Sequence, residues 1–569
     1  MRKVETPEKI EQFYRDTQNI AFPKLNDSQL AQLEPLGQHR IIKRGEFLYK
    51  AGEREAGFSV ILRGEIEAFE ARDGEEVELA TGGPRDFLGD ISMLTGNALL
   101  ANARGKAEES EVLFVPAQQL RRALAELPGL SDVIVRALLM RRKRLLKYPE
   151  FSGMRVVAMA DSREGHQLDD FLDKNHVPHR IISAESDHGK ALMDRLNLSA
   201  RNLPALITGS GMPLRQPSLR EVARVAGLLR SLTGEAGGNI FCDVVIVGAG
   251  PAGLAAAVYA SSEGLKCVVL ESYAPGGQAG SSSLIENFFG FPTGINGGDL
   301  TYRAQLQAYR FGAQFSTPAQ ALSLTFCDGE YPNCLQAEGC DGVLRAKSVI
   351  IASGADYRRL DAAGREEFEG AGVYYAATAM EGQLCRGATV IVAGAGNSAG
   401  QAAMFVSEGA EKVLLVVRRD QLSETMSDYL SRRVMAKSNI EILYHTEIRK
   451  MNGNNRLESV ELENKATGER RVVETPAVFS MIGALPCTKW LPPEIARDEK
   501  GFILTGAKVR EMPVWKAMER APGPLETSRP GVFAAGDVRS GSVKRCAAAV
   551  GEGGMAVAGV HEAIRTAAN

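Results

Sequence analysis

The sequence predicts a multidomain protein: a small antiparallel β-roll or barrel, a small α/β domain and a larger glycine-rich α/β region. Its 569 residues are too many for one hydrophobic core, because a domain usually holds ~100–200 residues. Residues 1–150 open with a helical stretch and continue in short alternating apolar runs, and buried-strand patterns alternate with amphipathic helices from residue 154. After residue 241, a strand–glycine turn–helix pattern occurs twice. Three kinds of architecture therefore follow one another along the chain.

Composition and charge are those of an ordinary globular protein. Hydrophobic residues make up 44% and charged residues 24%, and the formal net charge of −3 implies no overall attraction to nucleic acid or membrane. No apolar run reaches the ~18 residues of a membrane span. The N-terminal "MRKVETPEKI" lacks the apolar core of a secretory signal. We therefore expect a cytoplasmic protein with no membrane span and no nucleic-acid partner.

The cysteines are confined to the glycine-rich region. All eight lie between Cys242 and Cys546, and none forms a C-x-x-C pair. This spacing argues against a disulfide framework and against a zinc ribbon. We expect most of them to be buried free thiols, and we expect no metal site.

The N-terminal region, residues 1–150, contains the runs "EFLYKAG", "GFSVILRGEIEAFEA", "EVELATG" and "SEVLFVP", separated by Gly and Asp turns. Their spacing predicts a small antiparallel roll or barrel. A helical segment follows and ends in the basic run Arg141–Arg144. We interpret this run as a solvated helix C-terminus, because cations are favoured near that end of a helix.

Residues 154–230 have a different pattern. The buried-strand runs "MRVVAMA", "HRIISAE" and "LPALIT" alternate with amphipathic helices, which predicts a small α/β domain. The following stretch, residues 231–240, contains three glycines, which predicts a flexible linker.

The first glycine turn lies in "DVVIVGAGPAGLAAAVYA", where Gly248, Gly250 and Gly253 form G-x-G-x-x-G. The first glycine permits the tight turn, the second lets the backbone approach a pyrophosphate, and the third lets helix and strand pack closely. Glu271 ends the next strand about 20 residues on, where an acceptor for a ribose hydroxyl belongs. Together these features predict a dinucleotide site.

The second copy is "TVIVAGAGNSAGQAAMFV". Gly394 and Gly396 are its first two glycines, Ala399 is the third small residue, and Asn397 and Ser398 complete the turn. The following strand ends in Arg418 and Arg419 rather than in an acidic residue. Arginine at this place accommodates a 2′-phosphate, which favours NADPH over NADH.

Two dinucleotide sites in one chain imply two dinucleotides, most simply a flavin and a nicotinamide. The run "VFAAGDV" adds Asp537, which closes a small-residue turn after a strand. Its carboxylate is a candidate ligand for the ribityl or phosphate end of a flavin.

These motifs, with "PGGQ", "IENFFGFP", "MIGALP" and "KRCAAAVGEGGMAV", resemble the low-molecular-weight thioredoxin reductases over residues 241–569. The resemblance implies two Rossmann-like three-layer α/β domains and a homodimer. An FAD domain would comprise residues 241–359 and 487–569, with an NADPH domain at 360–486 inserted between them. By matched position, the residues along the flavin are Gly277, Gln278, Asn287, Asp537, Arg545, Cys546 and Ala547.

The family's redox dithiol is missing from the matching stretch "VYYAATAMEG". Ala376 and Ala379 stand at the two cysteine positions. Hydride transfer from NADPH to FAD needs no thiol. We therefore expect an FAD-dependent NAD(P)H oxidoreductase that passes electrons directly to a quinone, oxygen, another small molecule or a redox protein. The alternatives are a regulatory flavoprotein that senses the nicotinamide pool, and a thioredoxin reductase that uses other thiols, such as Cys546.

The two N-terminal regions carry further resemblances. Residues 38–145 resemble a cyclic-nucleotide-binding domain, in which Asp90 matches the acidic ribose ligand while Leu99 replaces the phosphate-binding arginine. Loss of that cation costs ~2–5 kcal/mol, which makes cyclic-nucleotide binding doubtful unless Asn102 or Arg104 compensates. Residues 154–230 resemble a thioredoxin or glutaredoxin fold, with Leu203-Pro204 as a cis peptide and "ADSREG" in place of the C-x-x-C.

Overall fold

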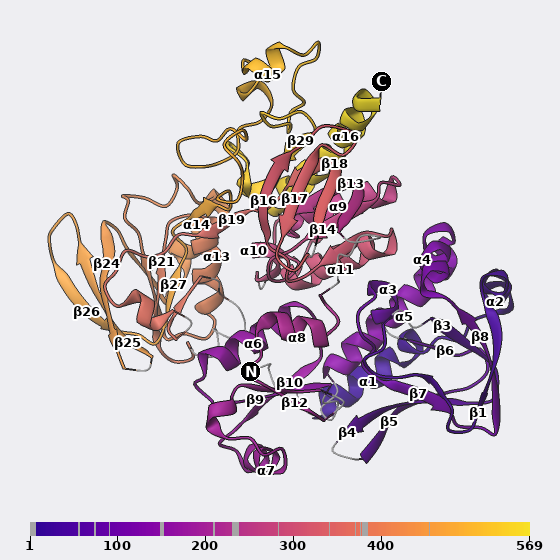
Figure 1. Ribbon diagram of the computed structural model, residues 1–569. Helices are drawn as coiled ribbons and strands as arrows, with labels where there is room; N and C mark the ends of the chain where they lie inside the picture. The colour runs from indigo at the N-terminus through magenta and orange to yellow at the C-terminus, as the bar shows by residue number, and fades with distance from the viewer. Residues whose placement is uncertain are drawn as a thin grey trace.

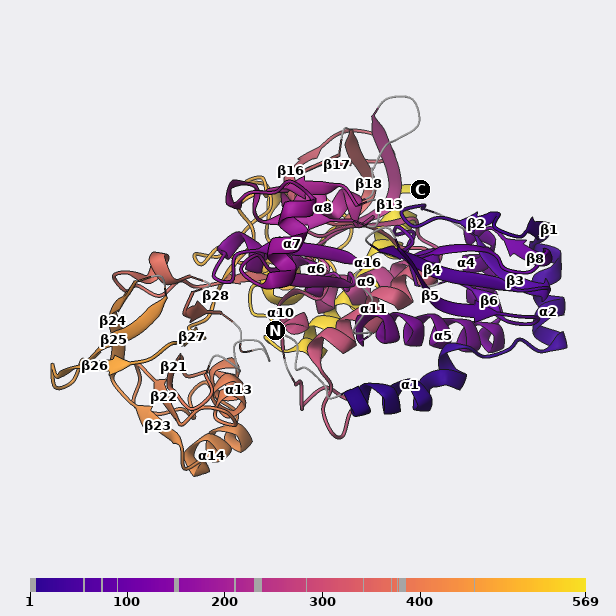
Figure 2. The same cartoon turned by 90° about the horizontal axis from the view of Figure 1, so that it is seen from below.

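The computed structural model describes residues 7–568 except 55–56, 73–74, 90, 148–152, 209–210, 230–237, 283, 341, 370, 376, 378–384 and 455. Figures 1 and 2 both place the glycine-rich unit (residues 239–351 and 532–568) in the middle, between the N-terminal β unit (residues 38–115) and the lobe of residues 373–480. Among the described helices, none has the length and apolarity that a membrane crossing requires.

The N-terminal unit is built from two antiparallel sheets, with strand orders β1-β8-β3-β6 and β2-β7-β4-β5. This confirms the predicted β-roll. The strands are β1 Gln38–Lys43, β2 Phe47–Tyr49, β3 Phe58–Arg63, β4 Ile66–Arg72, β5 Glu75–Gly82, β6 Phe87–Leu88, β7 Asn102–Gly105 and β8 Glu109–Val115. The helices are α1 Pro7–Ala21, α2 Asp27–Leu33, α3 Ser92–Thr95, α4 Ala117–Glu126 and α5 Pro128–Lys147.

The interpretation of Arg141–Arg144 as a solvated helix end is wrong. The Arg141 guanidinium donates to the carbonyls of Ala21 (2.8 Å) and Gly89 (2.9 Å). Arg142 is buried and donates to Ser92 Oγ at 3.0 Å. Arg144 donates to the Tyr14 carbonyl at 2.8 Å. The basic run therefore ties α5 to α1 and to the loop around α3, contacts that charge patterning along one helix does not reveal.

The middle unit is a four-stranded sheet of order β10-β9-β11-β12, in which β9 and β10 are parallel and the other pairs antiparallel. The Leu203–Pro204 peptide is cis. Its elements are β9 Met154–Ala158, α6 Arg163–Lys174, β10 His179–Ser183, α7 Asp187–Arg195, β11 Ala205–Ile207, β12 Pro213–Arg215 and α8 Leu219–Val225.

The large sheet of the C-terminal half is assembled from segments far apart in the chain. Its path is β15-β14-β13-β18-β17-β16, and β29 pairs in parallel with β18. The strands are β13 Asn239–Val247, β14 Cys267–Leu270, β15 Gln314–Ser316, β16 Ala321–Phe326, β17 Asn333–Ala337, β18 Val343–Ile351 and β29 Val532–Ala534. Three long helices, α9 Pro251–Ser262, α11 Gly297–Arg310 and α16 Cys546–Ala568, complete the unit.

Between β18 and β29, the chain forms a second α/β lobe. Its parallel sheet has the order β20-β27-β21-β22-β23, and a three-stranded sheet, β24-β25-β26, lies beside it. Where the chain enters and leaves the lobe, β19 Ala355–Tyr357 pairs with β28 Ala484–Pro486. The other elements are β20 Val373–Tyr374, β21 Thr389–Ala393, α13 Asn397–Val406, β22 Lys412–Val416, α14 Asp428–Ala436, β23 Ile440–Leu443, β24 Thr446–Gly453, β25 Leu457–Asn464, β26 Arg470–Glu474 and β27 Val478–Ser480.

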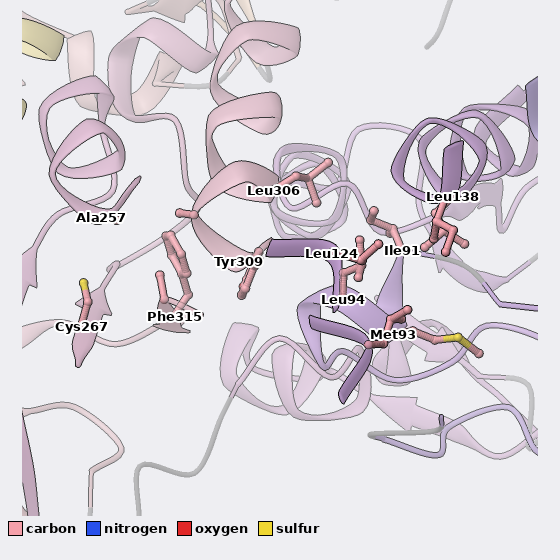
Figure 3. Close-up of a cluster of buried hydrophobic side chains, with 14 of the residues drawn as sticks. Ile91, Met93, Leu94, Leu124, Leu138, Ala257, Cys267, Leu306, Tyr309 and Phe315 are labelled. Carbon is pink, nitrogen blue, oxygen red and sulfur yellow. The ribbon is translucent and has the colours of Figure 1, made fainter. Parts of the chain in front are cut away.

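The N-terminal roll shares a hydrophobic core with the central unit. Figure 3 shows Leu94 and Leu124 of the roll beside Leu306 and Tyr309 of α11. The Arg310 guanidinium also donates to the Leu124 carbonyl at 3.0 Å. The roll is therefore fixed to the helix that packs beside α9.

One pair of cysteines departs from the expected free thiols. Cys327 and Cys334 form a disulfide across the turn between β16 and β17. The strand register places Cys334 opposite Thr325, two residues before Cys327. Cys340 lies beyond the end of β17 and remains a thiol.

Candidate nucleotide and flavin site

The first glycine turn joins β13 to α9 and leaves no room for side chains at two positions. Gly248 has φ +100°, and a Cβ there would lie 2.3 Å from the Ala352 carbonyl oxygen. A Cβ on Gly253 would lie 1.8 Å from the Gly248 carbonyl oxygen. At Gly250 the nearest atom to such a Cβ is the Gly277 Cα, 3.9 Å away. The turn is thus closed on the sheet side and open towards a cavity.

Glu271 lies directly after β14 and borders this opening. Its carboxylate accepts hydrogen bonds from the backbone N–H groups of Ala249 (2.8 Å) and Tyr273 (2.9 Å). Burial raises the pKa of the Glu271 carboxyl, and these two N–H donors act in the opposite direction. The two backbone bonds therefore fix the position of the carboxylate at the cavity wall.

Both glycine turns open into one cavity of about 1230 Å³. Almost all of the predicted cofactor ligands line it: Gly248, Gly250, Glu271, Gly277, Gln278, Asn287, Asp537, Arg545, Cys546 and Ala547, together with Gly394, Gly396, Asn397, Ser398, Arg418 and Arg419. Gly253 and Ala399 lie beneath the turns and do not line it. Their role is to permit packing, as the spacing of small residues indicated.

The second turn, between β21 and α13, repeats the geometry of the first. Gly394 has φ +140°, and a Cβ there would lie 2.3 Å from the Met481 carbonyl oxygen. Arg418 and Arg419 follow β22 and are exposed on the cavity wall. Arg419 pairs with Glu424 at 2.7 Å, whereas Arg418 forms no ion pair with any described residue. A free guanidinium in this position is available to a phosphate.

Sequence reasoning missed several basic residues on the cavity wall. Arg358 and Arg359 follow β19, and Arg449 lies on β24. Arg359 is paired with Glu369 at 2.7 Å, and Arg449 is paired with Glu463. No local motif marks these residues, because the fold of the inserted lobe alone brings them to the cavity.

The cavity wall also includes Asp537 and the start of α16. Burial raises the pKa of the Asp537 carboxyl, and Lys544 opposes this rise. The Lys544 ammonium donates to the Asp537 carbonyl at 2.9 Å. Burial, with a smaller contribution from the Asp537 charge, raises the pKa of the Cys546 thiol to about 11. Cys546 is therefore protonated at neutral pH, which does not suit a nucleophilic role.

These residues fit a bound FAD. The close approach of Gly250 and Gly277 leaves backbone rather than side chains at the cavity wall, Glu271 suits a ribose, and α9 and α16 both begin at the cavity.

Ala376, Ala379 and Asp90 lie outside the described residues. Within the described ranges, no group of three or more His, Cys, Asp or Glu side chains gathers as a metal site would require.

In the N-terminal roll, the two candidate substitutes for the missing arginine, Asn102 and Arg104, both have partners within the roll. The Arg104 guanidinium pairs with Glu67 (2.6 Å) and with Glu76 (2.7 Å). The Asn102 side-chain oxygen accepts from the Ala51 backbone N–H at 3.0 Å. Leu99 is buried, with 5% of its surface exposed. Leu99 thus offers no donor, two carboxylates balance the Arg104 charge, and the Asn102 amide is uncharged, so none of the three supplies an unpaired cation to a cyclic phosphate.

We therefore expect cyclic AMP at 1 mM to raise the melting temperature by less than about 1 °C, because ligand stabilisation is small when concentration does not exceed the dissociation constant. Differential scanning fluorimetry with cyclic AMP and cyclic GMP measures this. A concentration-dependent rise of several degrees would show that the roll finds a phosphate ligand elsewhere.

The middle unit is anchored to the predicted ribose site through Tyr273. The Tyr273 hydroxyl donates to Asp170 Oδ2 at 2.8 Å, and its ring packs edge-on against Phe171 at 5.5 Å between centroids. The Asn175 side chain donates to the Tyr273 carbonyl at 3.2 Å. Because the Tyr273 backbone N–H also holds Glu271, α6 supports the loop that presents this carboxylate.

We expect Tyr273→Phe to weaken FAD binding by roughly tenfold. A hydrogen bond to a charged acceptor is worth ~1.5–3 kcal/mol, and part of this should reach the adjacent Glu271 loop. Fluorescence titration of the FAD-free protein gives the dissociation constant. Tyr429→Phe, at an exposed tyrosine on α14, is the matched control and should change nothing. Equal affinities for the two variants would mean that α6 does not support the ribose site.

Comparison with known proteins places these observations in context. The family described as pyridine nucleotide-disulphide oxidoreductase matches residues 242–553, and the cyclic nucleotide-binding domain family matches residues 39–126. A thioredoxin reductase from Treponema pallidum is 34% identical over 327 residues, which cover 58% of this chain and 98% of the relative.

Two solved structures are also similar. The thioredoxin reductase of Lactococcus lactis in its FR conformation is 28% identical with a TM-score of 0.51, and the match covers 57% of this chain and 99% of the other. The thioredoxin reductase of T. acidophilum is 29% identical with a TM-score of 0.50, covering 57% and 98% respectively.

Proposed function

Since this chain belongs to the pyridine nucleotide-disulphide oxidoreductase family and is a thioredoxin-reductase-like FAD-containing NAD(P)H oxidoreductase, we propose that it transfers electrons directly to an acceptor without a dithiol. The observation that carries the proposal is the single cavity that both nucleotide turns line. A nicotinamide and a flavin that share one cavity can exchange a hydride with no intervening group. The resemblance matches Ala376 and Ala379 to the two cysteine positions of the redox motif, which supports transfer without a dithiol.

Each part of the cavity has a role in this reaction. Gly250 and Gly277 admit the pyrophosphate to the backbone at the start of α9, and Glu271 accepts from the ribose hydroxyls. Arg418 and Arg419 hold the 2′-phosphate and so select NADPH. Asp537 binds the ribityl or phosphate end of the flavin. When bound, the flavin supplies the two-electron chemistry that links NADPH to the acceptor.

We assign the other regions accordingly. Residues 241–359 and 487–569 form the FAD domain, and residues 360–486 form the NADPH domain. Residues 154–230 are a thioredoxin-like domain that has lost its redox pair and serves as a support. The parallel pairing of β18 with β29, the sheet order of the middle unit and its cis Pro204 support these assignments. By analogy with its relatives, the chain would act as a homodimer.

Stopped-flow spectroscopy tests the proposal. After mixing the FAD-loaded protein with NADPH in the absence of oxygen, we expect the flavin absorbance to bleach within a second and to recover when an acceptor is added. NADH should act more slowly. A flavin that stays oxidised for minutes in the presence of NADPH would overturn the proposed function.

A thiol-based reductase is the less favourable alternative. Burial raises the pKa of the Cys487 thiol to about 12, and the pKa of the Cys546 thiol reaches about 11. These two cysteines line the cavity, and thiols with such pKa values are mostly protonated at pH 7.

We expect iodoacetamide to label Cys546 slowly at pH 7, at a rate that rises roughly tenfold per pH unit, because only the thiolate reacts. Mass spectrometry of the FAD-free protein between pH 7 and 10 measures this dependence. The thiolate share grows as the pH rises towards the raised pKa, so a rate that is already maximal near pH 7 would restore the thiol alternative.

A further inference from the structure

A second cavity, of about 370 Å³, lies between α9, α11 and α16. Its wall includes Pro251, Phe288 and Cys546, which also line the nucleotide cavity. Its volume lies in the ~300–1,000 Å³ range of small-molecule sites. These three residues thus form a wall that the two cavities share. Cys546 is the first residue of α16 and lies among the predicted flavin ligands.

The chemistry of the second cavity differs from that of the first. Of the described residues that line it, none carries a charge at neutral pH, since even the Cys546 thiol has a pKa of about 11. The nucleotide cavity, in contrast, contains Arg358, Arg418 and Lys544. Desolvating a charged ligand against an uncharged wall is costly. The second cavity therefore suits a neutral ligand.

Three aromatic rings stand among the mainly aliphatic residues of its wall. Phe288, Phe311 and Tyr259 contribute rings, and the Tyr259 side chain remains 48% exposed at the surface. The Thr301 hydroxyl donates a hydrogen bond to the Gly297 carbonyl at 2.9 Å, so it is not available to a ligand. The exposed Gln307 offers a side-chain amide donor. A flat, apolar ring that carries a carbonyl oxygen matches both the aromatic wall and this amide.

We propose that this cavity binds the electron acceptor and that the acceptor is a quinone. The inference rests on the proposed function and names the class of substrate that the function leaves open. NADPH, one proton and the quinone yield NADP⁺ and the hydroquinone. The C4–H bond of the nicotinamide breaks, two electrons reach the quinone by way of the flavin, and both quinone oxygens become hydroxyls, with one proton taken from solvent.

The residues that line the second cavity do not suit other classes of acceptor. A disulfide substrate needs a thiolate relay at the flavin, and the thiol that borders both cavities, Cys546, is held protonated. An anionic small molecule would meet no compensating cation here. A quinone ring that contacts Phe288 and Cys546, which line both cavities, would border the space that the predicted flavin-binding residues surround.

Equilibrium dialysis of duroquinone against the oxidised, FAD-loaded protein tests the site without any turnover. Duroquinone is fully methylated, which disfavours addition of a thiol to its ring. We expect one molecule to bind per chain, and Ala304→Trp, which fills the cavity from α11, to weaken binding at least tenfold. Arg303→Trp adds the same ring one residue earlier, on an exposed position outside the cavity, and should bind duroquinone as the unmodified protein does.

Tyr259→Ala is a second variant that adds no bulk and so keeps the test valid if Ala304→Trp does not fold. We expect it to weaken binding roughly three- to tenfold, through loss of an aromatic wall. Absence of duroquinone binding, or equal binding by both tryptophan variants, would overturn the site. So would a dimer that Ala304→Trp dissociates, because a second copy would then cover the cavity. Failure of NADPH to bleach the flavin would refute the proposed function. The dialysis result would still show whether the second cavity binds a quinone.

Discussion

Substitution of Gly253 by alanine should strongly weaken FAD binding. The new methyl group would lie 1.8 Å from the Gly248 carbonyl oxygen, which belongs to backbone and cannot move aside as a side chain would. Either α9 moves away from β13 or the Gly248 turn opens, and both changes displace the backbone that faces the pyrophosphate. Overpacking of this kind costs ~1–3 kcal/mol, which corresponds to FAD binding weaker by roughly 5- to 150-fold.

Absorbance at 450 nm per protein chain after dialysis measures this loss directly. Gly551→Ala is the matched control, because Gly551 lies on α16 with no atom within 4 Å of a new Cβ. That variant should keep its FAD and gain ~0.5–1 kcal/mol of stability from the better helix propensity of alanine. If Gly253→Ala retained full FAD, the close contact between α9 and the turn would not govern cofactor binding.

The two glycine turns were predictable from the sequence because their chemistry is local. Gly248 and Gly253 are five residues apart, and the contact that each one permits is made within the same strand–turn–helix unit or with the adjoining strand. Glu271 could be placed for a similar reason, since β14 is the next strand and pairs directly with β13. Spacing along the chain is a reliable guide where it also fixes distance in space.

The remaining features depend on contacts between distant segments. Arg358 and Arg449 reach the cavity wall only because the lobe between β18 and β29 folds as it does. Arg142 becomes buried because α5 packs against the loop around Ser92, 50 residues earlier. Tyr273 showed no signal beyond its place after Glu271, since its partner Asp170 belongs to another unit. No periodicity or motif encodes such pairs in a single sequence.

The choice of nicotinamide should depend on Arg418 and Arg419, and the double variant Arg418→Ala/Arg419→Ala should show the second large effect. Both side chains follow β22 and line the cavity, and Arg418 has no ion-pair partner among the described residues. Hydrogen bonds to a charged group contribute ~1.5–3 kcal/mol, so we expect the KM for NADPH to rise roughly 10- to 150-fold. The KM for NADH, which lacks the 2′-phosphate, should stay the same.

Steady-state kinetics with both nucleotides gives the ratio that matters, because a general loss of structure would affect NADPH and NADH alike. Arg432→Ala is the matched control: Arg432 lies on α14, is 75% exposed, and pairs with Asp428 away from the cavity wall. An unchanged KM for NADPH in the double variant would mean that the phosphate is held elsewhere on the wall. Arg358 would then be the first residue to replace, since it lines the same cavity from the β19 side. An equal rise in the KM for NADH would instead mean that the two arginines stabilise the end of the strand and do not bind the phosphate.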